Sequence, residues 1–375
     1  MKFKIFLLSC ILLGAGFLSG EEAKKGRFNL AGDPVKPRFA VTEKVWPAKP
    51  GEASLCLWED DKLAAYSINI DDNCSGDVPF WLEQTKLFNF KVTWFLIAET
   101  VNDPKAALGG TWEIWKKVLA EGHEAESHSV SHWHNFSKDG TPPPGWKGFD
   151  WECTESIKML EAGLPGHKIR FLAYPGGPGQ KYNDPKIAGK YFLSARGGTG
   201  INAANQIDYT MIKYMSKANF GNPKTPWVDP ETMLDPKSKN NYRGWAIVLF
   251  HYVGKPEGKE AAKIALEFYK KNEKELWGGL YGNISLYCAE RDTASLKTEE
   301  SSADRIVLNL TDGMDDKLYD YPLTLKVRLP ENWKAAEAEQ NGKPIGVKLI
   351  ENEKNNFALV KAVPDRGKII LTPKK

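Results

Sequence analysis

The sequence predicts an α/β fold, with a parallel sheet covered by helices, followed by a smaller all-β domain. Between about residues 55 and 291, apolar strand-like runs alternate with longer amphipathic stretches, which is the pattern of repeated βα units. From about Thr298 onward the runs are short and separated by Asp, Gly, Asn and Pro, as in antiparallel strands. A chain of 375 residues is long enough for two such domains.

The first 20 residues have the pattern of a secretory signal peptide. Met1–Lys4 is basic, residues 5–18 are apolar, and small residues follow at Ser19 and Gly20. The apolar run is short for a membrane span. We therefore expect a secreted or periplasmic protein without a membrane span, in which residues 21–54, rich in Pro, Lys and Gly, form an extended lead-in.

Charge and cysteine content restrict the partners. The net charge of +3 falls to +1 when Lys2 and Lys4 are removed with the signal peptide, which favours neither nucleic acid nor a membrane surface. The remaining cysteines fit no zinc-ribbon or redox spacing; one or two disulfides are possible, and the sequence does not choose among the three complete pairings. These cysteines are Cys56, Cys74, Cys153 and Cys288.

The βα units can be placed along the chain. Strands are expected at residues 63–70, 91–98, 122–126, 168–174 and 245–250. Helices are expected at residues 79–88, 112–121, 151–162 and 258–276. This alternation predicts one domain over residues 55–293.

The C-terminal region, residues 298–375, is predicted to be a small antiparallel β-sandwich. Its clearest strands are residues 306–310, 323–329 and 368–371, and the middle one alternates strictly, so that one face is buried. The region holds no candidate catalytic constellation. It either binds glycan or braces the first domain, and the structural role is favoured.

Two histidines follow the third predicted strand. His128 and His132 are four residues apart, and on a helical turn such side chains share one face and reach the same cation. Asp71 and Asp72 end the first strand, where two adjacent carboxylates repel each other unless a cation lies nearby. Solvated aspartates and histidines without a metal are the alternative interpretation.

Other strands also end in polar or turn-forming residues. Residues 174–177 (Tyr-Pro-Gly-Gly) follow the fourth strand, and His251 follows the fifth. In parallel α/β barrels the carboxyl ends of the strands meet on one rim, where chemistry collects. This convergence predicts an active site more strongly than any single motif.

These motifs resemble the polysaccharide deacetylase family, the carbohydrate esterases with a NodB homology domain. Residues 69–73 (Asn-Ile-Asp-Asp-Asn) are similar to the family's first motif, residues 128–132 (His-Ser-Val-Ser-His) to its second, residues 173–177 to its third and residues 249–251 (Leu-Phe-His) to its last. All four occur in the family's order. The resemblance implies a distorted (β/α) barrel that removes acetyl groups from a polysaccharide or oligosaccharide.

The resemblance also implies a role for each site residue. Asp72, His128 and His132 would hold a divalent metal, zinc by preference with cobalt or nickel as alternatives. Asp71 would be the general base, and His251 would protonate the leaving group. The amide of Gly176 would help to stabilise the oxyanion. N-deacetylation is favoured, and an O-acetyl esterase is the alternative.

The chain departs from the family pattern at several positions. Ala173 stands where many members have an arginine that orients the base, and Arg170 or Arg196 could replace it. Asn73 replaces a glycine. The family's fourth motif, an Asp-Trp pair, is not recognisable in residues 191–202, and Asp208 is a loose candidate for it.

Two other classes of protein remain open. Two histidines and a carboxylate are also the ligand set of non-haem iron oxygenases, although these usually place a histidine and the carboxylate in one short motif on a β-sandwich. The second class is a catalytically inactive carbohydrate-binding relative, which would not need Asp71 or His251. The sequence does not identify the glycan or the oligomeric state.

The surroundings of the site suggest a glycan cleft. Trp133, Trp146 and Trp151 are each either cleft wall or ordinary packing, and residues 141–146 are expected to form a semi-rigid loop. Glycosylation sequons at Asn73 and Asn135 flank the site, and we expect neither to be used.

Overall fold

A computed structural model describes residues 41–133, 141–142, 144–177, 182–216 and 229–374. The predicted signal peptide, most of the expected lead-in, Asn135 and part of the 141–146 loop lie outside the described residues.

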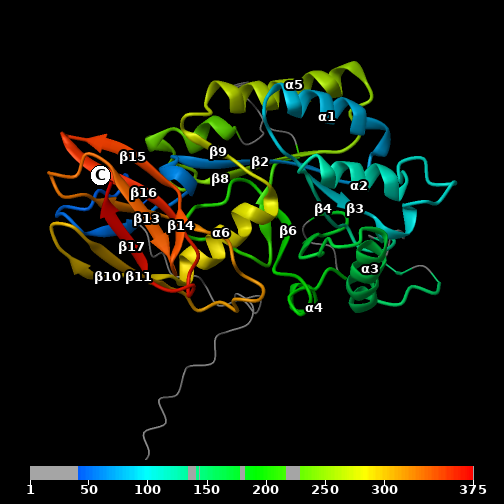
Figure 1. Ribbon diagram of the computed structural model, residues 1–375. Helices are drawn as coiled ribbons and strands as arrows, with labels where there is room; N and C mark the ends of the chain where they lie inside the picture. Colours follow the sequence, from blue (N-terminus) through cyan, green and yellow to red (C-terminus); the bar gives the residue numbers. More distant parts are fainter. Residues whose placement is uncertain (1–40, 134–140, 143, 178–181, 217–228, 375) are drawn as a thin grey trace, which may run out of the picture.

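The first domain is built on a parallel sheet that curls into a nearly closed barrel (Figure 1). Its strands occur in the order β7-β6-β5-β4-β3-β2-β8, each parallel to its neighbours. Met215 just after β7 bridges Val248 of β8, which joins the two ends of the sheet. The strands are β2 (Ala64–Ile70), β3 (Thr93–Leu96), β4 (Glu124–Ser127), β5 (Phe171–Ala173), β6 (Ser194–Thr199), β7 (Ile212–Tyr214) and β8 (Trp245–Phe250), with β9 (Leu276–Gly278) paired to β2. The predicted distorted (β/α) barrel is confirmed.

The distortion has a local cause between β4 and β5. These strands pair only at Ser127 and Leu172. Below that point the buried carboxylate of Glu126 accepts the backbone N–H groups of Arg170 and Phe171 at 2.8 and 2.9 Å. Buried backbone N–H groups need hydrogen-bond acceptors. Here the Glu126 side chain takes the place of the carbonyl groups that a regularly paired β4 would offer to β5.

Helices cover the outside of the barrel (Figure 1). They are α1 (Val78–Leu87), α2 (Trp112–Ala120), α3 (Phe149–Gly163), α4 (Pro185–Ala188) and α5 (Pro256–Lys271). Alternate residues of β2, such as Tyr66 and Ile68, belong to the apolar cluster that also contains residues of these helices. The helix predicted over residues 258–276 ends at Lys271, because the chain turns after Asn272 and Leu276 pairs with β2.

The C-terminal region forms two antiparallel sheets. One has the order β1-β12-β16-β15 and the other β10-β11-β17-β13-β14. Their strands are β1 (Ala53–Leu55), β10 (Ser295–Ser301), β11 (Ile306–Thr311), β12 (Leu323–Arg328), β13 (Ala336–Gln340), β14 (Lys343–Ile345), β15 (Val347–Asn352), β16 (Asn355–Ala362) and β17 (Ile369–Pro373). Strand β1 joins this region although it lies where the lead-in was expected to meet the barrel, and β10 begins before residue 298.

Helix α6 (Tyr281–Thr293) links the two regions. Nearly all of its residues are buried, and it lies between the barrel and the C-terminal sheets in Figure 1. Tyr281 packs on Phe95 and Phe171 of the barrel, and one continuous apolar cluster also includes Leu308 and Val360 of the two sheets. Barrel and sandwich therefore share a core.

Two further observations concern the described residues only. Cys56, Cys74, Cys153 and Cys288 are buried free thiols, so the disulfides that the sequence left open are not formed among them. In the described ranges, no helix combines the length and the apolar character that crossing a bilayer requires.

Candidate active site

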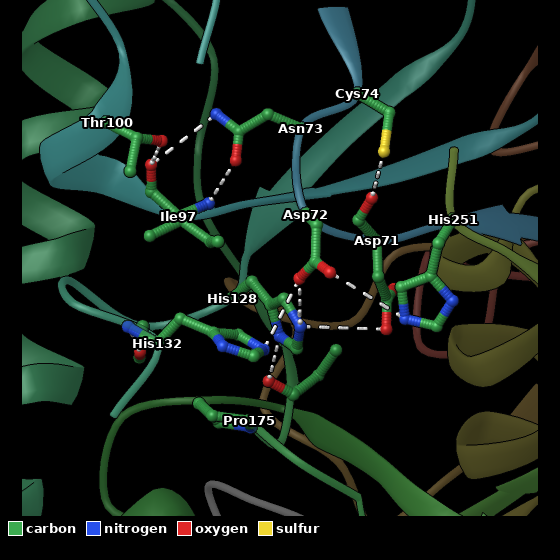
Figure 2. Close-up of polar contacts among 12 residues, drawn as sticks. Asp71, Asp72, Asn73, Cys74, Ile97, Thr100, His128, His132, Pro175 and His251 are labelled. Atoms are coloured by element: carbon green, nitrogen blue, oxygen red, sulfur yellow. Dashed lines mark hydrogen bonds and ion pairs between the residues drawn. The ribbon is translucent and has the colours of Figure 1, made fainter. Parts of the chain in front are cut away.

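The predicted site residues converge at the carboxyl ends of neighbouring strands. Asp71 and Asp72 follow β2, His128 follows β4, and His251 follows β8. Ile70 and Phe250 are register partners, and the Asp71 N–H donates to the Phe250 carbonyl, so His251 lies beside the aspartates. Figure 2 shows Asp72 at the centre of this group, with the imidazoles around it.

Three side chains form a cluster suited to a metal ion. Asp72 Oδ1 lies 3.5 Å from His128 Nε2 and 3.3 Å from His132 Nε2. The three atoms all lie within 4.8 Å of one another. One carboxylate and two imidazoles at such spacing are a ligand set for zinc and similar divalent ions.

The donor atoms are arranged as a cation would need them. His128 Nδ1 donates to the Ala173 carbonyl at 2.8 Å, which leaves Nε2 facing Asp72 and able to bind a cation once Nε2 has lost its proton. Asp72 Oδ1 is buried and makes no hydrogen bond with any described residue, despite the two nearby nitrogens. A buried carboxylate oxygen without a donor is costly, and a shared cation removes that cost. The cluster therefore fits a divalent metal.

The electrostatics of Asp72 and His128 show that the carboxylates of this cluster attract positive charge. Burial alone would raise the pKa of Asp72, but the contact with His128 and the charges of His128, His132 and His251 outweigh it and lower that pKa. Burial lowers the pKa of His128, and the Asp71 and Asp72 carboxylates more than compensate, so the result is a raised pKa. Asp72 stays ionised as a ligand must.

The histidines do not share a helical turn, so that expectation is wrong. Residues 128–132 form an irregular loop in which Ser129 and His132 have positive φ angles of 67° and 51°. The loop is fixed from α3, because the Glu152 carboxylate accepts the N–H groups of Val130 and Ser131 at 2.9 Å each. A second bond runs from the Ser131 hydroxyl to Glu152 at 2.6 Å.

Asp71 has different neighbours from Asp72. It is almost fully buried, and Arg196 Nη2 of β6 donates to its two carboxylate oxygens at 2.5 and 2.6 Å. Arg170 does not make this contact, since its guanidinium lies over the Phe171 ring. Of the two arginines that could replace the one missing at Ala173, Arg196 is the one in contact with Asp71.

His251 faces the same centre from the solvent side. Its Nε2 lies 3.9 Å from Asp72 Oδ2, and its side chain is 51% exposed. It is thus open to an incoming molecule. Asp208, the loose candidate for the fourth motif, is exposed and accepts hydrogen bonds from Thr210 in a local turn.

The turn that follows β5 borders the cluster. Gly176 and Gly177 have φ angles of 70° and 78°, which glycine adopts without strain. The N–H of Tyr174 donates to the Arg196 carbonyl, which ties the start of this turn to β6. Figure 2 shows Pro175 next to His128 and His132, and Gly176 follows Pro175 in the chain.

Asn73 has a structural reason for replacing glycine. Its φ angle is 59°, a left-handed conformation that asparagine tolerates better than most residues. Its Oδ1 accepts the Ile97 N–H at 2.8 Å and its Nδ2 donates to the Gly109 carbonyl at 3.3 Å. Asn73 is fully buried, which agrees with the expectation that its sequon is not used.

The tryptophans divide into packing and surface positions. Trp133 is buried and packs against Trp146 and Tyr182 at centroid distances of 4.4 and 4.7 Å. Trp146 also donates to Glu152 at 3.1 Å, so this aromatic group supports the histidine loop. Trp151 is partly exposed beneath Lys147. For Trp133 the packing interpretation holds.

The comparison with family models agrees with the motifs. Residues 61–189 match the model described as Polysaccharide deacetylase. This segment, about a third of the chain, therefore carries the likeness to the polysaccharide deacetylase family. The match includes Asp71, Asp72, His128, His132 and Gly176, whereas Arg196 and His251 lie beyond it.

Relatives and solved structures were also found. The chain is 33% identical over 353 residues to a gellan lyase from Bacillus sp, covering 88% of this chain and only 14% of that protein. Similar solved structures include a putative polysaccharide deacetylase from Mycobacterium smegmatis, with 16% identity, 65% and 94% of the two chains covered and a TM-score of 0.42. Another is a CE4 family pseudoenzyme from Bacillus anthracis, with 17% identity, 60% and 66% covered and a TM-score of 0.38.

Proposed function

We propose that this chain is a metal-dependent hydrolase that removes acetyl groups from a polysaccharide or oligosaccharide, with N-acetyl groups favoured. The observation that carries the proposal is the pairing of two carboxylates with different surroundings. Asp72 faces His128 and His132, whereas Asp71 is bound by Arg196. Metal-assisted hydrolysis uses a cation and a separate base, and the adjacent residues Asp72 and Asp71 would serve as a ligand of the cation and as the base.

Asp72, His128 and His132 are the residues that would hold the cation, zinc by preference with cobalt or nickel as alternatives. When bound, such an ion lowers the pKa of a water molecule and polarises a carbonyl group. The histidine loop and its bonds to Glu152 keep the imidazoles in place before substrate arrives.

The other residues move protons and stabilise charge. Asp71 takes a proton from the attacking water as that water adds to the acetyl carbon. The Gly176 amide donates to the carbonyl oxygen as negative charge develops there. His251 gives a proton to the departing amine as the bond between the acetyl carbon and nitrogen breaks, so acetate and a free amine are released.

An O-acetyl ester is the alternative substrate, because the same residues serve when the leaving group is an alkoxide. The likeness to part of a gellan lyase supports a polysaccharide as the substrate and does not distinguish the two bonds. Against an inactive carbohydrate-binding role, both Asp71 and His251 lie at the cluster, and pure binding requires neither. A non-haem iron oxygenase is disfavoured because the ligands come from separate barrel loops rather than one motif on a β-sandwich.

The test is an acetate-release screen across N- and O-acetylated glycans, with and without a chelator. We expect release that stops with the chelator and returns with zinc or cobalt. Asp71→Asn should retain the metal and lose turnover by about 10²-fold or more. Full activity of Asp71→Asn would remove Asp71 as the base, and release that ignores the chelator would remove the metal.

We further propose that residues 1–20 are a signal peptide and that the mature protein is secreted or periplasmic. The basic start and the apolar run support this. N-terminal sequencing of the protein from the medium or periplasm should begin near Glu21. An intact Met1 in the cell interior would contradict export.

A further inference from the structure

The two aspartates are almost equally close to the same imidazole. Asp71 Oδ2 lies 3.6 Å from His128 Nε2, and Asp72 Oδ1 lies 3.5 Å from it. Distance alone therefore does not separate the expected ligand from the expected base. A carboxylate this close to a ligand atom of a divalent cation would normally bind the cation as well. Some other feature must keep Asp71 free.

That feature is the guanidinium of Arg196. It is 2% exposed and its Nη2 lies 2.5 Å from the nearer oxygen of Asp71, so the pair is a buried charge-assisted contact. The guanidinium carbon lies 4.9 Å from the Phe95 ring centre and 4.7 Å from the Tyr214 ring centre. Packing between two rings restricts where the guanidinium can point. Asp72 contacts imidazoles instead.

Arg196 and Ala173 occupy matching positions on neighbouring strands. They are register partners in the β5–β6 ladder, and both are buried. The backbone bond from Tyr174 to the Arg196 carbonyl holds the strands in this register. Because register partners on parallel strands point to the same face, side chains from positions 173 and 196 enter the same part of the barrel.

We propose that Arg196 is a positioning residue that keeps Asp71 out of the ligand set of the divalent cation. We also infer that positions 173 and 196 are alternative places for one arginine, so that Ala173 here accompanies the arginine on β6. Both statements rest on the proposed metal centre. Without Arg196, the buried Asp71 carboxylate loses its counter-charge and turns toward the cation as its remaining source of positive charge.

The test compares wild type, Arg196→Ala and the double variant Ala173→Arg/Arg196→Ala in cobalt titrations followed by visible absorption. We expect Arg196→Ala to bind cobalt more tightly than wild type, as an added carboxylate ligand would cause. Its cobalt bands should shift and weaken, as they do when the coordination number rises. Acetate release should fall by about 10²-fold, mainly in kcat, because the base is misplaced.

The double variant should recover the wild-type cobalt spectrum and affinity and at least part of the turnover. A purely structural role would not move the spectrum, because thermal stability and coordination are independent readouts. Arg170→Ala is the matched control, since this arginine lies on the Phe171 ring and does not contact Asp71. It should leave the cobalt spectrum unchanged.

Each alternative outcome has a distinct meaning. An Arg196→Ala protein with an unchanged spectrum, or with cobalt affinity lower than wild type and not restored by Ala173→Arg, contradicts the inference. If Arg196→Ala does not fold, Arg196→Gln removes the charge and keeps most of the side-chain volume, and an unchanged cobalt spectrum combined with full turnover would then overturn the positioning role. Wild type that binds no cobalt contradicts the proposed metal centre itself. In a further outcome, wild type binds cobalt and the variants show the expected spectral shifts, but no acetate is released. That outcome supports the inference about Arg196 and contradicts only the proposed activity.

Discussion

Asp71 and Asp72 are chemically identical neighbours with different surroundings. Asp72 has a φ angle of 59°, and its side chain is 28% exposed and faces three imidazoles. Asp71 is nearly buried and faces a guanidinium. The sequence could predict that a carboxylate pair ends this strand. It could not decide between Arg170 and Arg196, because Arg196 and Asp71 are 125 positions apart and only the barrel brings them together.

Substitution of the central ligand should remove the metal. Asp72→Ala deletes the oxygen that both imidazoles approach. Loss of a residue that only supports a metal ligand lowers metal affinity by about 10- to 100-fold. Loss of the ligand itself should therefore lower zinc affinity by more than about 100-fold. Zinc titration calorimetry measures this. Asp77→Ala, a nearby aspartate whose carboxylate accepts the Val253 N–H, is the control and should bind zinc normally. Normal zinc binding by Asp72→Ala would contradict the assignment.

Substitution of the solvent-side histidine should separate activity from stability. Because the His251 side chain is half exposed, His251→Asn should change the free energy of unfolding by less than about 0.5 kcal/mol. Turnover should fall by about 10²- to 10⁴-fold if the imidazole protonates the leaving group. Steady-state acetate release and thermal melts measure the two effects. Unchanged kcat would exclude His251 as the acid.

At the scale of elements, strand ends were predicted well and the connecting loop was not. The buried strands β2 and β8 are mostly apolar, so their ends and the polar residues after them could be located. The spacing of His128 and His132 indicates a shared face only if the segment is helical. Here bonds to Glu152 and two left-handed residues produce the same convergence without a helix.

Glu152 should therefore matter to the metal although it is no ligand. Glu152→Ala leaves the N–H groups of Val130 and Ser131 without their acceptor, and buried unpaired donors cost about 1–3 kcal/mol each. We expect a lower melting temperature and a loss of zinc affinity of about 10- to 100-fold, which is typical when a residue that supports a metal ligand is removed. Glu155→Ala on the same helix removes only a contact with Lys158 and should change neither. Equal behaviour of the two variants would contradict this role.

Helix α6 and the strands β6, β7 and β9 were not predicted. Helix α6 is buried on nearly every side, so it has no polar face to produce a helical period. Strand β6 carries Arg196 and two glycines and lacks an apolar run. These elements depend on contacts with distant parts of the chain, and local sequence patterns do not reveal such contacts.

At the scale of the whole molecule, we expect the barrel and the C-terminal sheets to unfold together. They share an apolar cluster through α6, and β1 near the start of the barrel pairs with β12. A chain ending at residue 294 should therefore lose cooperative thermal unfolding, because it exposes the apolar side of α6. Calorimetry of the truncated and full chains tests this. A truncated chain with the melting temperature of the full chain would show that the C-terminal region has another role, such as glycan binding.

The contact between α6 and the C-terminal region should also make stability depend on pH. Burial, followed by the charges of Asp312, Asp320 and Asp316, raises the pKa of Glu290 to about 9, although the Tyr321 N–H bond opposes this. A carboxyl whose pKa is higher in the folded state favours folding below its unfolded pKa near 4.5, and this contribution is lost as pH rises toward 9.

Glu290→Gln should remove that pH dependence. Relative to the variant, wild type should lose about 3–4 kcal/mol of unfolding free energy between pH 5 and pH 8. Urea denaturation at both pH values measures the difference. A parallel pH dependence of the two proteins would show that Glu290 ionises normally.

The most direct test of the central claim is anomalous diffraction at the zinc edge from crystals of the full chain grown with zinc. We predict one strong peak in contact with Asp72, His128 and His132, with Asp71 still bound by Arg196. A peak at the separate carboxylate group of Asp312, Asp316 and Asp365, with none at the histidines, would contradict the account.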